Sequence, residues 1–274
     1  MLSVNTNVGA MAALQFLNQT QTELTTTQSH INSGLKVATA KDNGAVYAIA
    51  QNMRGNVAGY AAVSDSLNRG VSTVDVAISA GQSISDLLNE LKGKALAAAD
   101  SSLDTASRNA LNADFTALRD QITTIVQNAS FNGTNLVDGS TANFQALASS
   151  DGTKKITAAG QTLKLSGTIV TMKTTSTIST QAKASTMVST INASVQNVNA
   201  ALAKLASGSK KFSIQATFVS KLVDSLNAGI GNLVDADMAV ESAKLQSLQV
   251  KQQLGIQALS IANSAPSITL SLFR

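Results

Sequence analysis

Apolar side chains recur at alternating steps of three and four residues near the N-terminus of this chain, with two glutamines in the same row. The row runs through Leu14, Leu17, Gln21, Leu24, Gln28, Ile31 and Leu35. Steps of three and four place every member on one face of a helix that meets another helix. A less strict row near the C-terminus runs through Leu233, Met238, Leu245, Leu248, Ile256 and Leu259. The pattern predicts two terminal helices that lie beside each other.

The two ends of the chain carry almost no charge. No Asp, Glu, Lys or Arg precedes Glu23, and none lies between Lys251 and Arg274. Ordinary chain ends fray into solvent, so long uncharged ends with helical rows indicate burial in something larger than one subunit. We therefore predict an assembly protein whose subunit interface includes the N-terminal row and, in the C-terminal row, Met238, Leu245, Leu248, Ile256 and Leu259. Amides at Gln21 and Gln28 are typical of seams that set register and partner number.

Helical periodicity also dominates the interior of the chain. Residues 34–44 have a glycine at each end and are predicted to form a connector. Rows at helical spacing then cover about residues 67–95, 105–125, 188–205 and 212–233, the last running on into the C-terminal row. The Asn132-Gly133 turn is expected to end the helix before it, and Ser207-Gly208 to break the helix that contains it.

Residues 138–183 follow a different pattern. Short Thr-rich and β-branched runs at residues 154–157, 162–165 and 168–172 are separated by glycine-containing turns, which predicts small strands or hairpins. The expected fold is therefore mainly α: a long coiled-coil-like helical hairpin with both termini paired, plus a small β-rich outer region, an α+β rod.

Composition argues against several functions. The 274 residues include no Cys, no Trp, one His and one Pro, with 3% aromatic and 13% charged residues against about 25% in an average protein. An enzyme would have to find its acid, base or nucleophile in this small inventory, so we predict no enzyme and no cofactor. We also predict no metal site, because His30 has no Cys or second His with which to bind an ion. The net charge is +4, but Lys and Arg are scattered, so we expect no nucleic-acid partner. The N-terminus lacks a basic secretory signal, and polar residues interrupt the C-terminal segment, so no membrane insertion is expected.

Ordered blocks at both ends of the chain resemble bacterial flagellin, the subunit of the flagellar filament. At the N-terminal side they are residues 2–7, 33–37, 40–42, 48–50, 68–72 and 131–133. At the C-terminal side they are residues 235–239 with Glu241, then 262–266 and 270–274. These blocks extend the expected interface to Leu270, Leu272, Phe273 and Arg274.

The resemblance implies a structural subunit that polymerises into the extracellular filament used for swimming. It implies export through the flagellar type III apparatus with a chaperone, and partners that include paralogous flagellins, the filament cap and hook-associated proteins. The implied domains are an inner tube (1–44 and 233–274), a helical rod (45–137 and 184–232) and a variable outer region (138–183). After the Ala-Lys pair the chain has Asp42-Asn43-Gly44, where the family usually has two Asp followed by small residues.

The family segment recognised by innate immune receptors of animals is Arg-rich, with a Leu after Glu. The equivalent residues here are Leu88, Asn89, Glu90, Leu91 and Lys92, followed by Gly93 and Lys94. This difference in charge predicts weak recognition.

Two alternative functions remain open from the sequence alone. A hook–filament junction protein would share the terminal rows, and a filament formed by the purified chain alone would argue against it. A coiled-coil receptor or secreted effector would need a membrane anchor or a separate functional domain, and the sequence shows neither.

Overall fold

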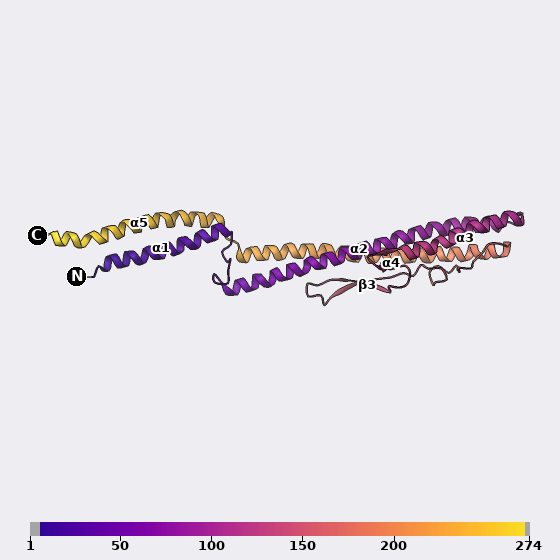
Figure 1. Ribbon diagram of the computed structural model, residues 1–274, viewed down its shortest axis with the longest axis horizontal. Helices are drawn as coiled ribbons and strands as arrows, with labels where there is room; N and C mark the ends of the chain where they lie inside the picture. Colours follow the sequence, from indigo (N-terminus) through magenta and orange to yellow (C-terminus); the bar gives the residue numbers. More distant parts are fainter. Residues whose placement is uncertain (1–5, 272–274) are drawn as a thin grey trace. The chain divides into compact units, whose positions relative to one another are not determined.

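Five helices and four short strands make up the described part of the chain. The computed structural model describes the backbone of residues 6–271 and the side chains of residues 6–264. The mainly helical fold predicted from the sequence is confirmed (Figure 1). The elements are α1 (Val8–Ser33), α2 (Gly44–Ala98), α3 (Thr105–Asn128), β1 (Ser130–Phe131), β2 (Thr134–Asn135), β3 (Asn143–Leu147), β4 (Lys155–Ala159), α4 (Gln181–Val234) and α5 (Met238–Ser271).

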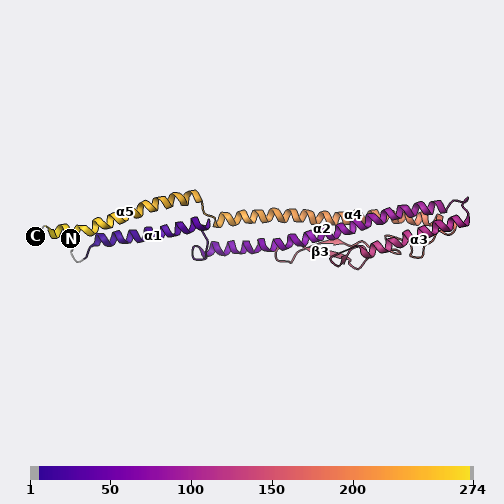
Figure 2. The same ribbon diagram turned by 45° about the horizontal axis from the view of Figure 1, so that its top comes forward.

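The contacts divide the chain into two units, so that α2 and α4 each contribute to both. The first unit contains residues 1–55 and 225–274, and the second contains residues 56–224. In the first unit α1 and α5 lie side by side, with their chain-terminal ends together (Figures 1 and 2). The predicted pairing of the two terminal helices is therefore confirmed.

The core of the second unit lies between α2, α3 and α4. Each helix contributes a row of buried apolar side chains at helical spacing, and the row on α4 is the one expected from its heptads. Segments between the helices add further buried side chains. Representative members of this core are Leu67, Ile84, Leu91, Phe115, Ile122, Leu163, Met172, Ile191, Val198 and Phe212.

Two antiparallel hairpins accompany this core. The first joins β1 to β2 through Asn132 and Gly133, both with positive φ, as the Asn-Gly signal predicts. The second pairs β3 with β4, from Asn143 opposite Ala159 to Leu147 opposite Lys155. The strand predicted at residues 154–157 is thus confirmed within β4.

The strands predicted at residues 162–165 and 168–172 are wrong. Most of their apolar side chains are buried, but their backbone groups bond to single partners and form no ladder. The Leu163 amide donates to the Val137 carbonyl at 2.7 Å, and the Ser166 amide donates to the Met172 carbonyl at 2.8 Å. Packing against helices has replaced pairing between strands.

Two predictions about the fourth helix also need correction. Gly208 does not break α4; a Cβ there would lie 3.0 Å from the Ala158 side chain, so the glycine lets β4 approach the helix. The helix does not run on into the C-terminal row either. It ends at Val234, where Leu35 and Asp235 form an isolated antiparallel bridge.

Candidate functional site: the paired helices α1 and α5

One heptad seam joins α1 to α5. Its members are buried or half-buried and recur at steps of three and four on both helices. Leu17 lies beside Gly255, and Gln21 is hydrogen-bonded to Gln252. Later residues of α1 therefore lie beside earlier residues of α5, so the two helices are antiparallel. The seam comprises Ala10, Ala13, Leu17, Thr20, Leu24, Thr27 and Ile31 of α1 with Glu241, Leu245, Leu248, Gln252, Gly255, Leu259 and Ala262 of α5.

The seam on α1 is rotated relative to the row read from the sequence. Leu17, Leu24 and Ile31 belong to both rows, but Ala13, Thr20 and Thr27 complete the observed seam. Leu14, Gln21 and Gln28 lie on one flank and are exposed, so these two amides are not buried between α1 and α5. The observed seam therefore contains smaller side chains than the predicted row does.

The other predicted interface residues lie in several environments. Leu245, Leu248 and Leu259 occupy the seam, whereas Met238 and Ile256 are exposed. Leu35 follows α1 and is half-buried in the connector. Leu270 belongs to α5, whose side chains are described only as far as Ser264, and Leu272, Phe273 and Arg274 lie outside the described residues. Their assignment to a subunit interface stays a prediction.

Local signals define where the two helices start and stop. The Asn7 side chain accepts a hydrogen bond from the Ala10 amide at 3.0 Å, and its Nδ2 donates to the Ala262 carbonyl at 2.6 Å. Asp237 accepts from the Ala239 amide at 2.9 Å and so caps the start of α5. Gly34 ends α1 in the left-handed conformation with φ of 71°, which glycine adopts without steric cost.

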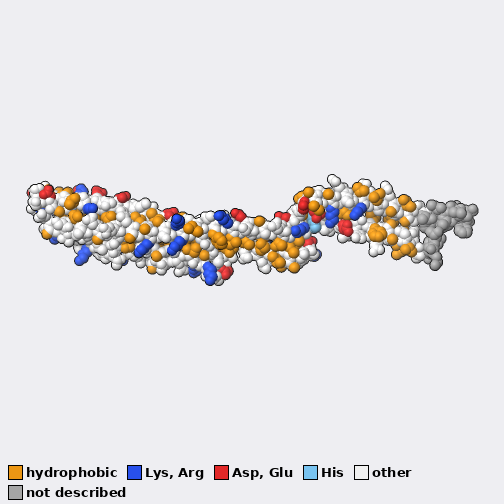
Figure 3. Space-filling view, turned by 180° about the vertical axis from the view of Figure 1, so that it is seen from behind, with side chains coloured by type: hydrophobic (Ala, Val, Ile, Leu, Met, Phe, Trp, Pro, Cys, Tyr) orange, Lys and Arg blue, Asp and Glu red, His pale blue; other side chains and the backbone are white. Residues whose placement is uncertain are grey.

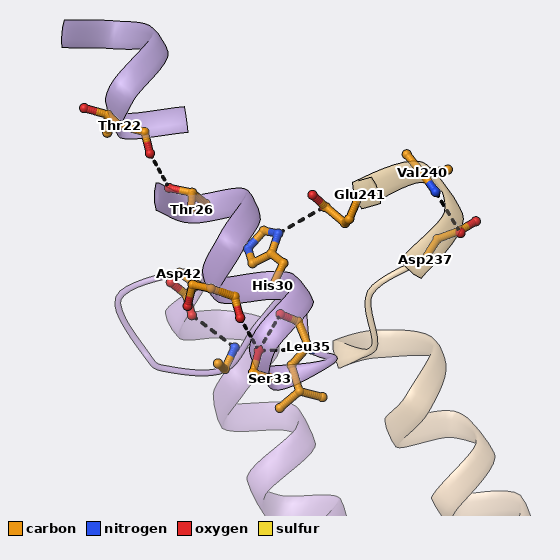
Figure 4. A network of polar contacts seen from close by, with 11 residues as sticks. Thr22, Thr26, His30, Ser33, Leu35, Asp42, Asp237, Val240 and Glu241 are labelled. Carbon is orange, nitrogen blue, oxygen red and sulfur yellow. Dashed lines mark hydrogen bonds and ion pairs between the residues drawn. The ribbon is translucent and has the colours of Figure 1, made fainter. Parts of the chain in front are cut away.

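Backbone hydrogen bonds join the connector that follows α1 to the C-terminal end of α4, at the β-bridge between Leu35 and Asp235. The Lys36 amide donates to the Val234 carbonyl at 2.8 Å, and the Ala236 amide donates to the Gly34 carbonyl at 2.9 Å. Farther along, the Asp42 carboxylate accepts hydrogen bonds from the Thr39 and Ala38 amides (Figure 4). The Thr39 amide chiefly holds the pKa of the Asp42 carboxyl below its ordinary value, because it stabilises the ionised form.

One polar pair crosses the seam next to this bridge. His30 Nδ1 lies 3.0 Å from Glu241 Oε1, and both side chains are mostly buried (Figure 4). His30 is in the last turn of α1 and Glu241 is in the first turn of α5, where the helix dipoles favour a cation and an anion respectively. Among the described residues the second Glu241 oxygen has no hydrogen-bond partner. The sequence alone did not indicate that His30 pairs with Glu241, because 211 positions separate them.

Large apolar side chains remain uncovered on the outer faces of this helix pair. Figure 3 shows orange side chains exposed over this part of the molecule. Such a surface on a chain end indicates a partner. The exposed residues are Val8, Met11, Leu14 and Phe16 on α1, with Met238, Val240, Val250, Leu254, Ile256 and Ile261 on α5.

The described residues contain no metal-binding cluster. Between residues 6 and 264, no three His, Asp or Glu side chains cluster so that they could hold a metal ion. Nor is any described helix both long and apolar enough for a membrane span.

Residues 88–92, which the resemblance assigned to the innate-receptor region, lie on α2 in the second unit. Leu88 and Leu91 are fully buried in the core, so they are not available to a partner in this state. Asn89 and Glu90 are exposed, and Lys92 is half-buried.

Comparison with known proteins agrees with this arrangement. Residues 4–142 match the family model of the bacterial flagellin N-terminal helical region, and residues 188–273 match that of the C-terminal helical region. Flagellin FljK of Caulobacter vibrioides is 56% identical over 99% of this chain and 98% of its own length. Flagellin FljN of the same organism is 57% identical over the same shares, and a flagellin of Brucella melitensis is 34% identical over the full length of both chains. The chain belongs to the bacterial flagellin family.

Proposed function

We propose that the α1/α5 pair is the surface through which this flagellin, a structural subunit of the bacterial flagellar filament, joins copies of itself. The observation that carries the proposal is the run of exposed apolar side chains on two helices whose outer halves, before Glu23 and after Lys251, contain no Asp, Glu, Lys or Arg. Stacking such helices removes apolar surface from water without like-charge repulsion. Each copy supplies the same pair, so the contact can repeat without limit.

We propose the inner tube to be residues 1–44 and 233–274, the rod to be 45–137 and 184–232, and the outer region to be 138–183. The first contact unit extends about ten residues farther on each side than this inner tube, to residue 55 and back to residue 225.

The expected partners follow from the family. Caulobacter vibrioides has several flagellins that are 44–57% identical to this chain, which supports copolymerisation with paralogues. We further propose export through the flagellar type III apparatus with a chaperone, contact with the filament cap and hook-associated proteins, and an extracellular location. We assign the chain no enzymatic activity, in keeping with a family of structural proteins.

The experiment is polymerisation of the purified chain, followed by electron microscopy. The full chain should form long helical filaments, and a variant without residues 266–274 should not. Its circular dichroism should lose only the signal of the removed residues, because the second unit keeps its core. Filaments from the shortened chain would contradict an essential role for this end.

We also propose weak recognition by innate immune receptors. Glu90 is an exposed negative charge in a segment that is Arg-rich in the family, and Lys94 Nζ is 2.7 Å from Asp114 Oδ2. A charge of the wrong sign at an interface can cost several kcal/mol. A receptor reporter assay should show much lower potency for this monomer than for an enterobacterial flagellin, and equal potency would contradict the proposal.

A further inference from the structure

A groove opens on one flank of the seam between α1 and α5. It has a volume of about 390 Å³. Phe16 and Leu254 form its apolar walls and are 69% and 57% exposed. Glu23 and Lys251 line it as well and contribute one charge of each sign. We call this groove, lined by Phe16, Thr20, Glu23, Lys251, Leu254 and Gly255, the socket.

Gly255 gives the socket its space. It occupies a seam position on α5, and a Cβ there would lie 3.3 Å from Leu17 Cδ1. Glycine inside a helix is less favourable than alanine by about 1 kcal/mol. A side chain at this position would fill the floor of the groove, so the glycine keeps the socket open at a cost in helix stability.

The opposite flank of the same seam has a complementary surface. At 3.6 residues per turn, Leu14 and Gln21 lie on the side of α1 away from Phe16 and Glu23. Gln252 Nε2 donates to Gln21 Oε1 at 2.7 Å, which places both amides on this flank. Leu14 and Ile256 are 48% and 54% exposed. We call Leu14, Gln21, Gln28, Gln252 and Ile256 the ridge.

We propose that the socket of one copy receives the Leu14 and Ile256 side chains on the ridge of a second copy. The ridge has no charged residue, and the socket has one of each sign, so no net repulsion opposes the contact. A second copy is the occupant because this filament subunit presents both surfaces on the same helix pair. This inference rests on the proposed role of the α1/α5 pair in polymerisation and names the contact.

The arrangement determines the type of assembly. Socket and ridge are different surfaces on opposite flanks, so the contact is heterologous: each copy has a free ridge after its socket is filled. Heterologous contacts that do not close into a ring generate open helical polymers. A socket-to-socket contact would instead give a closed dimer.

Cross-linking tests the contact directly, because the chain has no native cysteine. Leu14→Cys and Leu254→Cys chains, one with an affinity tag, are mixed, polymerised and treated with a short bis-maleimide. We expect the mixed dimer in polymer and not in monomer, with few dimers of either chain with itself. Val250→Cys replaces Leu254→Cys as the control, since Val250 is similarly exposed at 55% but does not line the socket.

The outcomes separate the two proposals. If the cysteine-free chain forms no polymer, the role of the pair in polymerisation is wrong. If polymer forms and the Leu14→Cys chain reacts no better with Leu254→Cys than with Val250→Cys, the socket is wrong. Dimers formed mainly by Leu254→Cys alone would also overturn it, because they indicate a closed socket-to-socket contact.

Filling the socket provides a second test. Gly255→Leu should raise the critical concentration for polymerisation about tenfold or more, where tenfold corresponds to about 1.4 kcal/mol. Gly93→Leu is the matched control, since Gly93 is exposed on α2 and a Cβ there would meet no atom within 4 Å. Polymerisation of Gly255→Leu at the wild-type concentration would overturn the inference. If this variant loses helix by circular dichroism, the cross-linking result decides.

Discussion

A single charge in the seam should abolish assembly at ordinary concentrations. Leu248 is 2% exposed, and it is the buried apolar side chain of α5 in the part of that helix with described side chains. Leu248→Asp removes about 2 kcal/mol of leucine burial. An unpaired carboxylate in its place costs at least about 2 kcal/mol more. Among the described residues, the seam on α1 contains no basic side chain that could pair with it, apart from the adjoining His30.

The magnitude can be converted into an observable quantity. A total of about 4 kcal/mol corresponds to a rise of about a thousandfold in critical concentration, at 1.4 kcal/mol for each factor of ten. The assay is sedimentation of polymer over a series of protein concentrations, with electron microscopy of the pellet. Leu248→Asn is the matched control: it has nearly the shape of Asp without the charge, and we expect a smaller rise.

The second unit supplies an internal reference for this experiment. Leu248 lies outside residues 56–224, so hydrogen exchange in α3 should be the same in the variant and in the wild type. Normal filaments of Leu248→Asp at the wild-type critical concentration would refute the reasoning that this seam must form in the polymer. Loss of protection in α3 would show that the substitution acts by general unfolding.

Three further predictions concern the outer hairpin, the chain ends and the glycines of α2. A small polar insertion after Gly152, where a Cβ would meet no atom within 4 Å, should leave filament formation intact by electron microscopy; loss of filaments would place this turn in a contact. Hydrogen exchange of a verified monomer should be fast in residues 6–36 and 238–271, because packing against α5 buries only Leu24 and Thr27 of α1. Strong protection of these residues in the monomer would contradict folding coupled to assembly. Gly59→Ala should lower the melting temperature, because its Cβ would lie 2.7 Å from a backbone oxygen of the β3–β4 turn. Gly93→Ala should instead raise the free energy of unfolding by about 0.5–1 kcal/mol. Equal effects of the two substitutions on stability would show that no clash occurs at Gly59.

Local signals explain which elements the sequence predicted well. The connector that begins at Gly34, the helix that begins at Thr105 and the turn at Asn132-Gly133 all depend on residues next to one another in the chain. Capping groups and left-handed turns act over three or four residues, so a linear pattern contains them.

Distant packing explains the errors. Gly208 resembles a helix breaker, but α4 continues because Ala158 of β4 needs the space that a side chain would occupy. The apolar runs at residues 162–172 resemble strands, but their neighbours are helices and single backbone partners. The end of α4 at Val234 depends on a bridge to a residue about two hundred positions earlier in the chain. A linear pattern does not include these partners.

The functional surface divides in the same way. The uncharged ends and the rows at steps of three and four follow from residue order alone, because helix periodicity is a local property, and they sufficed to indicate paired helices in an assembly. The tertiary structure decided which flank of the shared row, Leu17, Leu24 and Ile31, would be covered. Smaller side chains allowed α5 to pack on one side, and this choice left Leu14 and Gln21 exposed and Gly255 at the floor of a groove. A row at steps of three and four specifies the buried face of a helix only approximately. Side-chain packing against the partner helix decides which flank of that row is covered.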